Sequence, residues 1–268
     1  LKVQSQAEVL PFQVAEDDNA PEAARLKHRF VELRREKLHQ NILLRSDVIA
    51  ATREIMHDLG FREFQTPILT SSSPEGARDY LVPSRHYPGK FFALPQAPQQ
   101  FKQLIMVAGF DRYFQIAPCF RDEDPRADRS PGEFYQLDIE MSFVEQGNVF
   151  EAGEAIFTPL FSRFAGCHVD SGPYQRIPYK EALEQFGSDK PDLRNSLRIE
   201  DVSEVFAASE FRVFQSALAE GGAVRAIAVQ LAELPSRKYF DDTVAWFQDV
   251  SGQGLAYLAF KGEVTKGS

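Results

Sequence analysis

Cysteine is scarce in this sequence, and its scarcity excludes several kinds of stabilised fold. Cys119 and Cys167 are the only two cysteines among 268 residues. Two cysteines give no disulfide framework, and their separation does not fit the paired spacing of zinc ligands. The five histidines are scattered without the spacing of helical metal ligands. We therefore expect reduced thiols, a cytoplasmic location and no histidine metal site.

Long apolar runs and an excess of basic residues are also missing. No run of about 18 apolar residues occurs, and the N-terminus has no signal-peptide pattern, so we expect no membrane segment. The net charge is −9. This charge argues against non-specific coating of nucleic acid, although a local basic loop can still bind it. The Walker loop, GxGxxG and GxSxG motifs are absent, so any ATP must be bound by other means.

What is present is enough apolar material for a sizeable core, since 43% of the residues are hydrophobic and 23 are Phe. Apolar residues at helical spacing predict a helix from Leu43 to Leu59, and Gly60 is typical of the position after its end. A short strand is expected from Phe61 to Gln65. Residues 70–89 form a long polar loop, which in a compact domain is usually functional or mobile.

Residues 117–144 carry the most information, because they predict two strands joined by a charged loop. Apolar and polar side chains alternate strictly in the second strand, from Glu133 to Val144. The face expected in the core contains Tyr135, Leu137, Ile139, Met141 and Phe143. The opposite face contains Phe134, Gln136, Asp138, Glu140 and Ser142. With the first strand expected to end in Arg121-Asp122-Glu123, this second face is the predicted floor of a polar site.

The charged residues of this hairpin allow both a functional and a structural interpretation. Arg121 and Glu123, two apart on a strand, would point the same way, and arginine binds oxyanions bidentately. An isolated pair of this kind is equally well a surface ion pair. Asp138 and Glu140 are paired carboxylates or simply the polar outer face of a sheet.

The loop between the strands and the helix before them are also candidates. Arg126 and Arg129 form either a solvated hairpin tip or a clamp on phosphates of a nucleic-acid backbone. Pro98 opens a predicted helix that runs to about Ala108. On this helix Gln99 and Lys102 share one face near the positive N-terminal end.

The sequence resembles a known family at several places. FRDEDPRADRSPGEFYQLDIEMSF (120–143) is similar to motif 2 of the class II aminoacyl-tRNA synthetases, and Phe61–Pro67 with its preceding helix is similar to motif 1. Within class II the chain resembles the bacterial aspartyl-tRNA synthetases. The segments that carry this resemblance are LRREK (33–37), TPILTSSSPEGARDYLVPSR (66–85), KFFALPQAPQQFKQLIMVAGFDRYFQIA (90–117) and GSDKPDLRN (187–195).

The resemblance implies an α+β fold, with an antiparallel sheet flanked by helices and a smaller α+β insertion domain. It implies a linker over residues 1–22, an incomplete catalytic core over residues 23–195 and a partial bacterial insertion domain over residues 196–268. The implied activity is aspartate–tRNA ligation, in which ATP and Mg²⁺ convert L-aspartate to aspartyl-adenylate before transfer to tRNA(Asp). A homodimer with Pro67 at its interface is also implied.

The resemblance further assigns roles to individual residues. Arg121 and Glu123 are the implied catalytic residues. The implied aspartate-binding residues are Glu75, Gln99, Lys102, Arg121, Gln136 and Asp138. The implied ATP-binding residues are Arg121, Asp122, Glu123, Ser130 and Phe134. Arg126 and Arg129 would contact the acceptor end of the tRNA.

The sequence also departs from the family pattern. It has Ala97 where many members have Ser, and its loop RSPGEF is one residue longer than the common RQPEF form. Motif 3, its metal-binding carboxylates and the anticodon-reading OB-fold are absent, so we expect no metal ligands in this chain and little activity from it alone. The chain is then a fragment or the ordered core of a longer protein.

Two other functions stay open. One is a truncated, non-catalytic paralogue that serves as a binding or dimerisation module. The other is a sister enzyme, either asparaginyl-tRNA synthetase or ammonia-dependent asparagine synthetase. The segment PEGARDY and the insertion-domain flank favour the aspartyl enzyme.

Overall fold

The computed structural model describes residues 2–6, 8–15, 19–73, 75–123, 132–261 and 263–267. The chain divides into two compact units, Leu1–Tyr174 and Gln175–Ser268. Each unit is described by itself.

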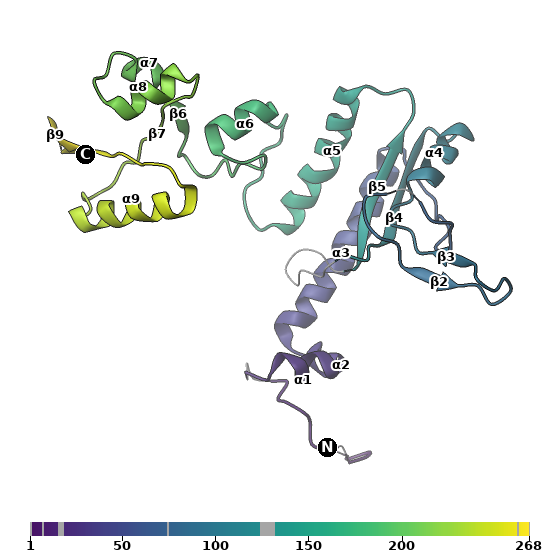
Figure 1. Ribbon diagram of the computed structural model, residues 1–268. Helices are drawn as coiled ribbons and strands as arrows, with labels where there is room; N and C mark the ends of the chain where they lie inside the picture. The colour runs from purple at the N-terminus through teal and green to yellow at the C-terminus, as the bar shows by residue number, and fades with distance from the viewer. Residues whose placement is uncertain are drawn as a thin grey trace. The chain divides into compact units, whose positions relative to one another are not determined.

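The first unit is built on a three-stranded sheet (Figure 1). Its strands are β1 (Arg62–Glu63), β4 (Arg112–Phe120) and β5 (Glu133–Met141), in the order β1-β4-β5. The long β4 and β5 strands pair antiparallel, whereas β1 lies parallel to β4. A separate antiparallel hairpin joins β2 (Leu81–Pro83) to β3 (Phe91–Ala93).

Helices cover the two faces of this sheet differently. The helices of the unit are α1 (Glu22–Lys27), α2 (Arg29–Glu32), α3 (Glu36–Asp58), α4 (Gln99–Val107) and α5 (Gln146–Phe164). Figure 1 shows α3 and α5 on one side of the β4–β5 pair and α4 on the other. Between the sheet and the α3–α5 layer lies the apolar core, with Met56, Phe61, Phe114 and Ile156 at its centre. The face that α4 covers is therefore free for polar side chains.

The end of α3 confirms the helix stop expected at Gly60. Gly60 has φ +80°, a left-handed conformation that glycine adopts without strain. The Gly60 amide donates to the His57 carbonyl and the Phe61 amide to the Met56 carbonyl, each at 2.9 Å. This is a Schellman motif, and the buried Phe61 and Met56 side chains pack in one core cluster beside it. The helix begins earlier than predicted, at Glu36.

The central hairpin is confirmed, but both of its strands are shorter than expected. β4 ends at Phe120, so Arg121, Asp122 and Glu123 lie beyond the strand and not on it. β4 ends at this point because its backbone changes hydrogen-bond partner. The Arg121 amide still donates to the Gly132 carbonyl, whereas the Asp122 amide turns to the Arg78 carbonyl at 3.0 Å.

The predicted apolar face of β5 is confirmed in the middle of the strand and wrong at its ends. Leu137, Ile139 and Met141 pack against the core cluster. Tyr135 is half exposed, and Phe143 is 96% exposed and lies past the end of the strand. Phe143 has φ +56°, where the chain leaves the sheet for α5. Alternation cannot indicate where pairing stops.

Two further expectations need correction. The strand expected from Phe61 to Gln65 pairs with β4 only over Arg62–Glu63. The loop expected over residues 70–89 is interrupted by β2, which pairs with β3 as the first strand of a hairpin. The three-residue strand β2 is not predicted from the sequence because Ser, Pro and Gly, which are typical of loops, surround it.

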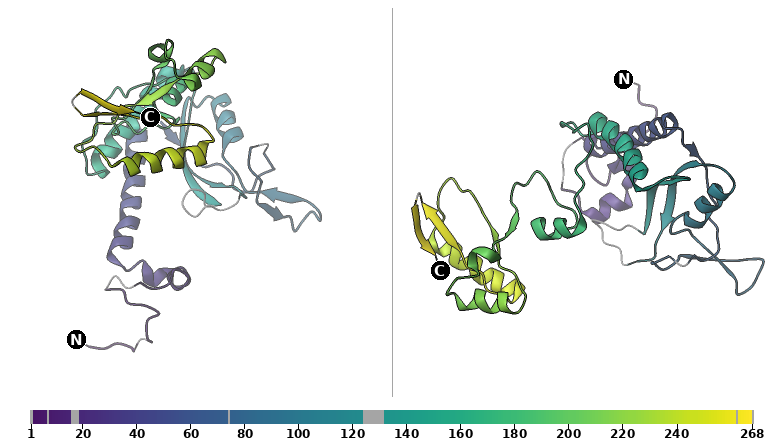
Figure 2. Two further views of the ribbon diagram at one scale, coloured as in Figure 1. Left: turned by 60° about the vertical axis from the view of Figure 1, so that its left-hand side comes forward. Right: turned by 90° about the horizontal axis from the view of Figure 1, so that it is seen from above.

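The second unit is a mixture of short helices and strands (Figure 2). Its elements are α6 (Tyr179–Phe186), β6 (Ile199–Asp201), α7 (Ser203–Phe206), α8 (Arg212–Ala219), β7 (Arg225–Ile227), α9 (Arg237–Ser251), β8 (Leu258–Lys261) and β9 (Glu263–Gly267). Two antiparallel pairs, β6–β7 and β8–β9, form its sheets. The predicted α+β fold class is confirmed.

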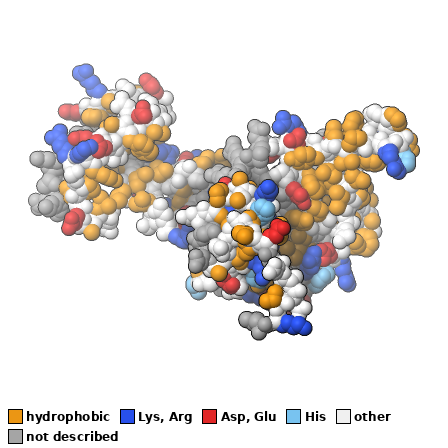
Figure 3. Space-filling view, turned by 90° about the horizontal axis from the view of Figure 1, so that it is seen from below, with side chains coloured by type: hydrophobic (Ala, Val, Ile, Leu, Met, Phe, Trp, Pro, Cys, Tyr) orange, Lys and Arg blue, Asp and Glu red, His pale blue; other side chains and the backbone are white. Residues whose placement is uncertain are grey.

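The surface of the described chain keeps many large apolar side chains exposed. Figure 3 shows such side chains gathered over the right-hand part of the face seen from below. In the β2–β3 hairpin Leu81, Phe91 and Phe92 are all exposed. Among the described residues no helix is both long enough and apolar enough to cross a membrane.

Candidate functional site

The polar face of the β4–β5 hairpin is assembled by the register of the two strands. Residues directly opposite one another in an antiparallel pair point to the same face. The facing pairs on this face are Tyr113 with Glu140, Gln115 with Asp138, Ala117 with Gln136 and Cys119 with Phe134. The polar row predicted from β5 thus has a second row beside it, contributed by β4.

Helix α4 brings a lysine onto this face. Lys102 Nζ lies 3.0 Å from Asp138 Oδ1 and 3.2 Å from Glu140 Oε2. The Lys102 and Asp138 side chains are each 11% exposed, and that of Glu140 is 28% exposed. One buried cation is therefore shared by two carboxylates, which leaves the cluster with an excess negative charge.

The electrostatics of the cluster keep Lys102 protonated. Burial acts to lower the pKa of Lys102, because the charged ammonium loses its water. The hydrogen bonds and charges of Asp138 and Glu140 act in the opposite direction and outweigh burial, so the Lys102 pKa is raised above its usual 10.5. The side chain is a fixed positive charge at neutral pH.

A buried hydrogen-bond network lies beside the cluster. The Tyr113 hydroxyl donates to Gln115 Oε1 at 2.8 Å, and the Thr66 hydroxyl donates to the same oxygen at 3.0 Å. Burial, and then the charge of Asp138, raises the pKa of the Tyr113 phenol. Asp138 Oδ2 is buried and has no hydrogen-bond partner among the described residues. A buried carboxylate oxygen without a donor is costly, so this atom is an unused acceptor beside Lys102.

The other end of the face holds an arginine and an aromatic ring. The Arg121 guanidinium carbon lies 5.0 Å from the centre of the Phe134 ring. Cys119 is fully buried, and its thiol contacts Gln136 Oε1 at 3.3 Å. Burial raises the pKa of Cys119 to about 11, although the Arg121 charge acts to lower it. Arg121 is therefore close enough to act electrostatically on the polar row.

The loop from residue 70 to residue 80 runs along the same region. Arg78 Nε donates to the Asp122 carbonyl at 3.0 Å, and the backbone of the two residues is hydrogen-bonded as well. Gln96, which is 2% exposed, accepts from the Ala77 amide at 3.1 Å and donates to the Ala77 carbonyl at 2.9 Å. Glu75 lies in this loop and is partly exposed. Its side chain has no hydrogen bond or ion pair with another described residue.

The structure brings together only some of the residues predicted for the site. Lys102, Asp138, Gln136, Arg121 and Phe134 share one region of the sheet. Gln99 is half-buried on the first turn of α4, and Glu123 is exposed beyond the end of β4; neither side chain has a described partner. The Asp122 backbone is hydrogen-bonded to both the backbone and the side chain of Arg78. Arg126, Arg129 and Ser130 lie outside the described residues.

Four further residues belong to the site and were not among the predicted ligands. For Glu140 the sequence leaves both a paired carboxylate and a polar outer face open, and its period-two spacing from Asp138 is the signal that could have placed it beside Lys102. Tyr113 and Gln115 follow the same alternation on β4, but only the pairing register of β4 with β5 shows that they lie beside Glu140 and Asp138. Gln96 stands in a Pro-rich turn, and no local pattern reveals its long-range contacts.

Three observations concern ligands at other places. No group of three metal-ligating side chains that could hold a metal ion occurs in the described part of the chain. A small hollow of about 30 Å³ lies between the 70–80 loop and the start of α4, lined among others by Asp79, Gln96 and Phe101. A larger hollow of about 430 Å³ belongs to the second unit.

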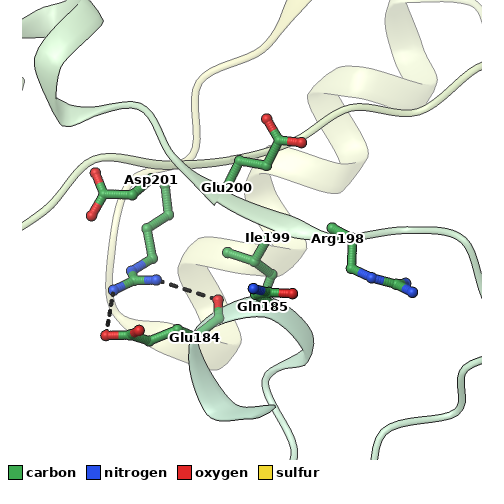
Figure 4. Close-up of a pocket in the computed structure, with 7 residues that line it drawn as sticks. Glu184, Gln185, Arg198, Ile199, Glu200 and Asp201 are labelled. Atoms are coloured by element: carbon green, nitrogen blue, oxygen red, sulfur yellow. Dashed lines mark hydrogen bonds and ion pairs between the residues drawn. The ribbon is translucent and has the colours of Figure 1, made fainter. Parts of the chain in front are cut away.

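This larger hollow offers little to a specific ligand (Figure 4). It is lined by Glu184, Gln185, Arg198, Ile199, Glu200, Asp201 and Arg225. The Glu200 and Asp201 carboxylates point in different directions in Figure 4. Arg225 is already bonded to the Glu184 carbonyl at 3.3 Å, and Arg198 stacks on Phe186 at 4.3 Å. We therefore place the candidate site on the polar face of the sheet.

Comparison with known proteins finds close relatives of this chain. A protein from Rickettsia bellii named aspartate–tRNA(Asp/Asn) ligase is 57% identical over 98% of this chain, which covers 45% of that protein. A protein of the same name from Gluconobacter oxydans is 58% identical over the whole chain, which again covers 45% of it. This chain thus spans less than half the length of these relatives.

The fold has counterparts among solved structures. One is asparaginyl-tRNA synthetase from Pyrococcus horikoshii complexed with asparaginyl-adenylate, with a TM-score of 0.57 and 23% identity. The likeness covers 65% of this chain and 43% of that one. The family of class II tRNA synthetases (D, K and N) matches residues 21–249. The matched range spans most of the sequence, so this chain belongs to the class II tRNA synthetases (D, K and N).

Proposed function

We propose that this chain carries the aspartate-binding part of an aspartyl-adenylate site and belongs to an aspartate–tRNA ligase. One observation carries the proposal: Lys102 is held between Asp138 and Glu140, while Asp138 Oδ2 has no donor among the described residues. The cluster offers a fixed cation for a ligand carboxylate and an unused acceptor for a ligand ammonium. Any amino acid supplies both groups, and one with an acidic side chain can place its side-chain carboxylate on Lys102 while its α-carboxylate stays free to react.

The same arrangement accounts for selection of aspartate over asparagine. The Lys102 ammonium stays charged at neutral pH. An asparagine amide in its place would not supply the negative charge with which the ligand carboxylate attracts this cation, in a site that is largely closed to water. Gln136, Gln99 and Glu75 are proposed to complete the aspartate contacts. Glu75 would join them as the 70–80 loop closes over the ligand.

Arg121 and Phe134 are proposed to bind ATP. The guanidinium suits the α-phosphate, and the Phe134 ring offers a face on which adenine can stack. An oxygen of the aspartate α-carboxylate then attacks the α-phosphorus of ATP, and pyrophosphate leaves. The site's contribution is to hold the two reactants in line. Asp122, Glu123 and Ser130 are proposed as further ATP contacts, and Arg121 and Glu123 as the catalytic pair.

Mg²⁺ would neutralise the ATP phosphates in such a reaction. The described residues contain no cluster that fits the metal, so no step through it is assigned to this chain. Arg126 and Arg129 are proposed to meet the acceptor stem of tRNA(Asp). The exposed Pro67, with Ile68 and Leu69 exposed beside it, is proposed to lie at a homodimer interface. The proposed location of the enzyme is the cytoplasm.

The division of the chain is also a proposal. We assign residues 1–22 to a linker, residues 23–195 to the catalytic core and residues 196–268 to part of an insertion domain. The boundary between the two compact units lies earlier, after Tyr174. Residues 175–195 would then belong to the catalytic core by family resemblance, although their contacts place them in the second compact unit.

A non-catalytic binding or dimerisation module is the second candidate. The exposed apolar side chains Ile68 and Leu69 beside Pro67 offer the surface on which such a module would pair. Calorimetry with L-aspartate and with ATP, combined with an ATP–pyrophosphate exchange assay, tests both candidate functions. We expect the 268-residue chain to bind both ligands and to show little or no exchange. Absence of aspartate binding would refute the proposed site, and near-normal exchange would refute the inactivity of the isolated chain.

A further inference from the structure

Gln96 lies at a junction between the rigid part of the first unit and the loop that carries Glu75. It follows β3 in a turn between Pro95 and Pro98. The Phe120 amide, at the end of β4, donates to the Pro95 carbonyl at 2.9 Å. Proline fixes its own backbone torsion, so the turn is stiff and is tied to the central sheet. The base from which the Gln96 side chain extends is therefore well fixed.

The Gln96 amide uses its hydrogen-bonding groups on the loop. Its oxygen accepts from the Ala77 amide at 3.1 Å. Its nitrogen donates to the Ala77 carbonyl at 2.9 Å and also to the Asp79 carboxylate. A glutamine amide offers one acceptor oxygen and two N–H donors, and all three groups are used here. At 2% exposure the side chain has little water to replace these partners.

The loop is also fixed at its other end. Thr70 and Ala93 exchange two backbone hydrogen bonds, at 2.8 and 3.0 Å. Glu75 lies between this bridge and the Ala77 anchor. The small hollow of about 30 Å³ beneath the loop is lined by residues from both sides, including Ser73, Asp79 and Gln96. Glu75 thus lies between the Thr70–Ala93 bridge and the contacts of Gln96 with Ala77, and Arg78 ties the loop to Asp122 further along.

We propose that Gln96 is a positioning residue that holds the 70–80 loop so that Glu75 can engage the amino-acid ligand. This inference rests on the proposed function for the identity of the ligand, but the anchoring itself does not. Gln96 acts through the Ala77 backbone and Asp79 and does not touch the ligand. Loss of its amide would release the loop and weaken ligand binding without disturbing the sheet.

The test uses three variants of the 268-residue chain and two measurements. Gln96→Ala removes all three contacts, and Gln96→Glu removes the donors while keeping the acceptor. Gln96→Glu combined with Asp79→Asn reverses donor and acceptor between positions 96 and 79, which restores that hydrogen bond. The matched control is Gln103→Ala, the same change at an exposed position of α4. Hydrogen exchange is followed on peptides from residues 70–80 and from β4, and L-aspartate affinity is measured by calorimetry.

We expect both single Gln96 variants to exchange faster in the 70–80 peptides, with β4 peptides and Gln103→Ala unchanged. Aspartate affinity should fall by about tenfold, the effect of one or two lost hydrogen bonds, and should recover in part in the double variant. Unchanged loop exchange would overturn the anchor, and faster exchange with unchanged affinity would overturn its role in binding. If the wild type binds no aspartate, the proposed function fails while the exchange result still decides the anchor.

Discussion

At the scale of single residues, Lys102 has the largest expected effect on stability. It is the described cation that pairs with both Asp138 and Glu140. Lys102→Met would leave two neighbouring carboxylates without it on a largely buried face. Removing one partner of a buried ion pair costs about 3 kcal/mol, because the other is left uncompensated. We expect this loss in the free energy of unfolding measured with urea at pH 7, and a change within about 0.5 kcal/mol for Lys37→Met on the exposed side of α3.

The pH dependence of this difference has a definite sign. The pKa of Lys102 is raised in the folded protein above its usual 10.5. Its contribution to stability is therefore fully present below pH 10.5 and is lost as the pH rises through the folded-state pKa. The gap in unfolding free energy between wild type and Lys102→Met should be constant from pH 7 to pH 10 and narrow above that. A gap that narrows below pH 9 would contradict the observed pairing.

The two cysteines should differ sharply in reactivity. Cys119 is fully buried with a pKa of about 11, whereas Cys167 is exposed. Because the thiolate is the reactive form, Cys119 should stay unmodified by a disulfide reagent at pH 8 until the protein unfolds. One thiol should therefore react quickly in the native chain. Cys167→Ser should remove that fast reaction and Cys119→Ser should preserve it; the opposite pattern would exclude the described burial of Cys119.

At the scale of elements, the end of α3 offers a test with a built-in control. Gly60 has φ +80°, and the space that a β-carbon would take there is open, so Gly60→Ala adds backbone strain without a clash. The cost should be about 1 kcal/mol. Gly153 lies inside α5 and is equally uncrowded. Gly153→Ala should stabilise by about 0.8 kcal/mol, since alanine favours the helix. Thermal unfolding of both variants checks the pair, and two shifts of the same sign would contradict the cap.

The elements also show what the sequence can and cannot predict. Helical spacing and Gly60 correctly indicate α3 and its end, and strict alternation indicates the polar face of β5. Strand limits are missed where a long-range partner decides them, as when the Asp122 amide turns to Arg78. The Lys102 cluster needs α4 to pack on the sheet, and the Gln96 anchor joins residues 19 positions apart. Such contacts depend on tertiary packing, which local patterns do not contain.

At the scale of the whole molecule, the proposed aspartate contacts all lie in the first unit, Leu1–Tyr174. A chain that stops after Tyr174 should therefore bind L-aspartate within about threefold of the affinity of the 268-residue chain, as expected for an independent unit. Calorimetry compares the two lengths directly. Circular dichroism would confirm that the shorter chain is folded. A folded shorter chain that no longer binds aspartate would show that the second unit contributes to the site.

The central claim is that the Lys102–Asp138 cluster selects an amino acid with an acidic side chain. The most direct measurement is calorimetry of the 268-residue chain with L-aspartate and with L-asparagine, repeated on Lys102→Met. We predict that the wild type binds aspartate at least about tenfold more tightly than asparagine and that the variant loses this preference. Equal affinities in the wild type, or an unchanged preference in Lys102→Met, would contradict the account.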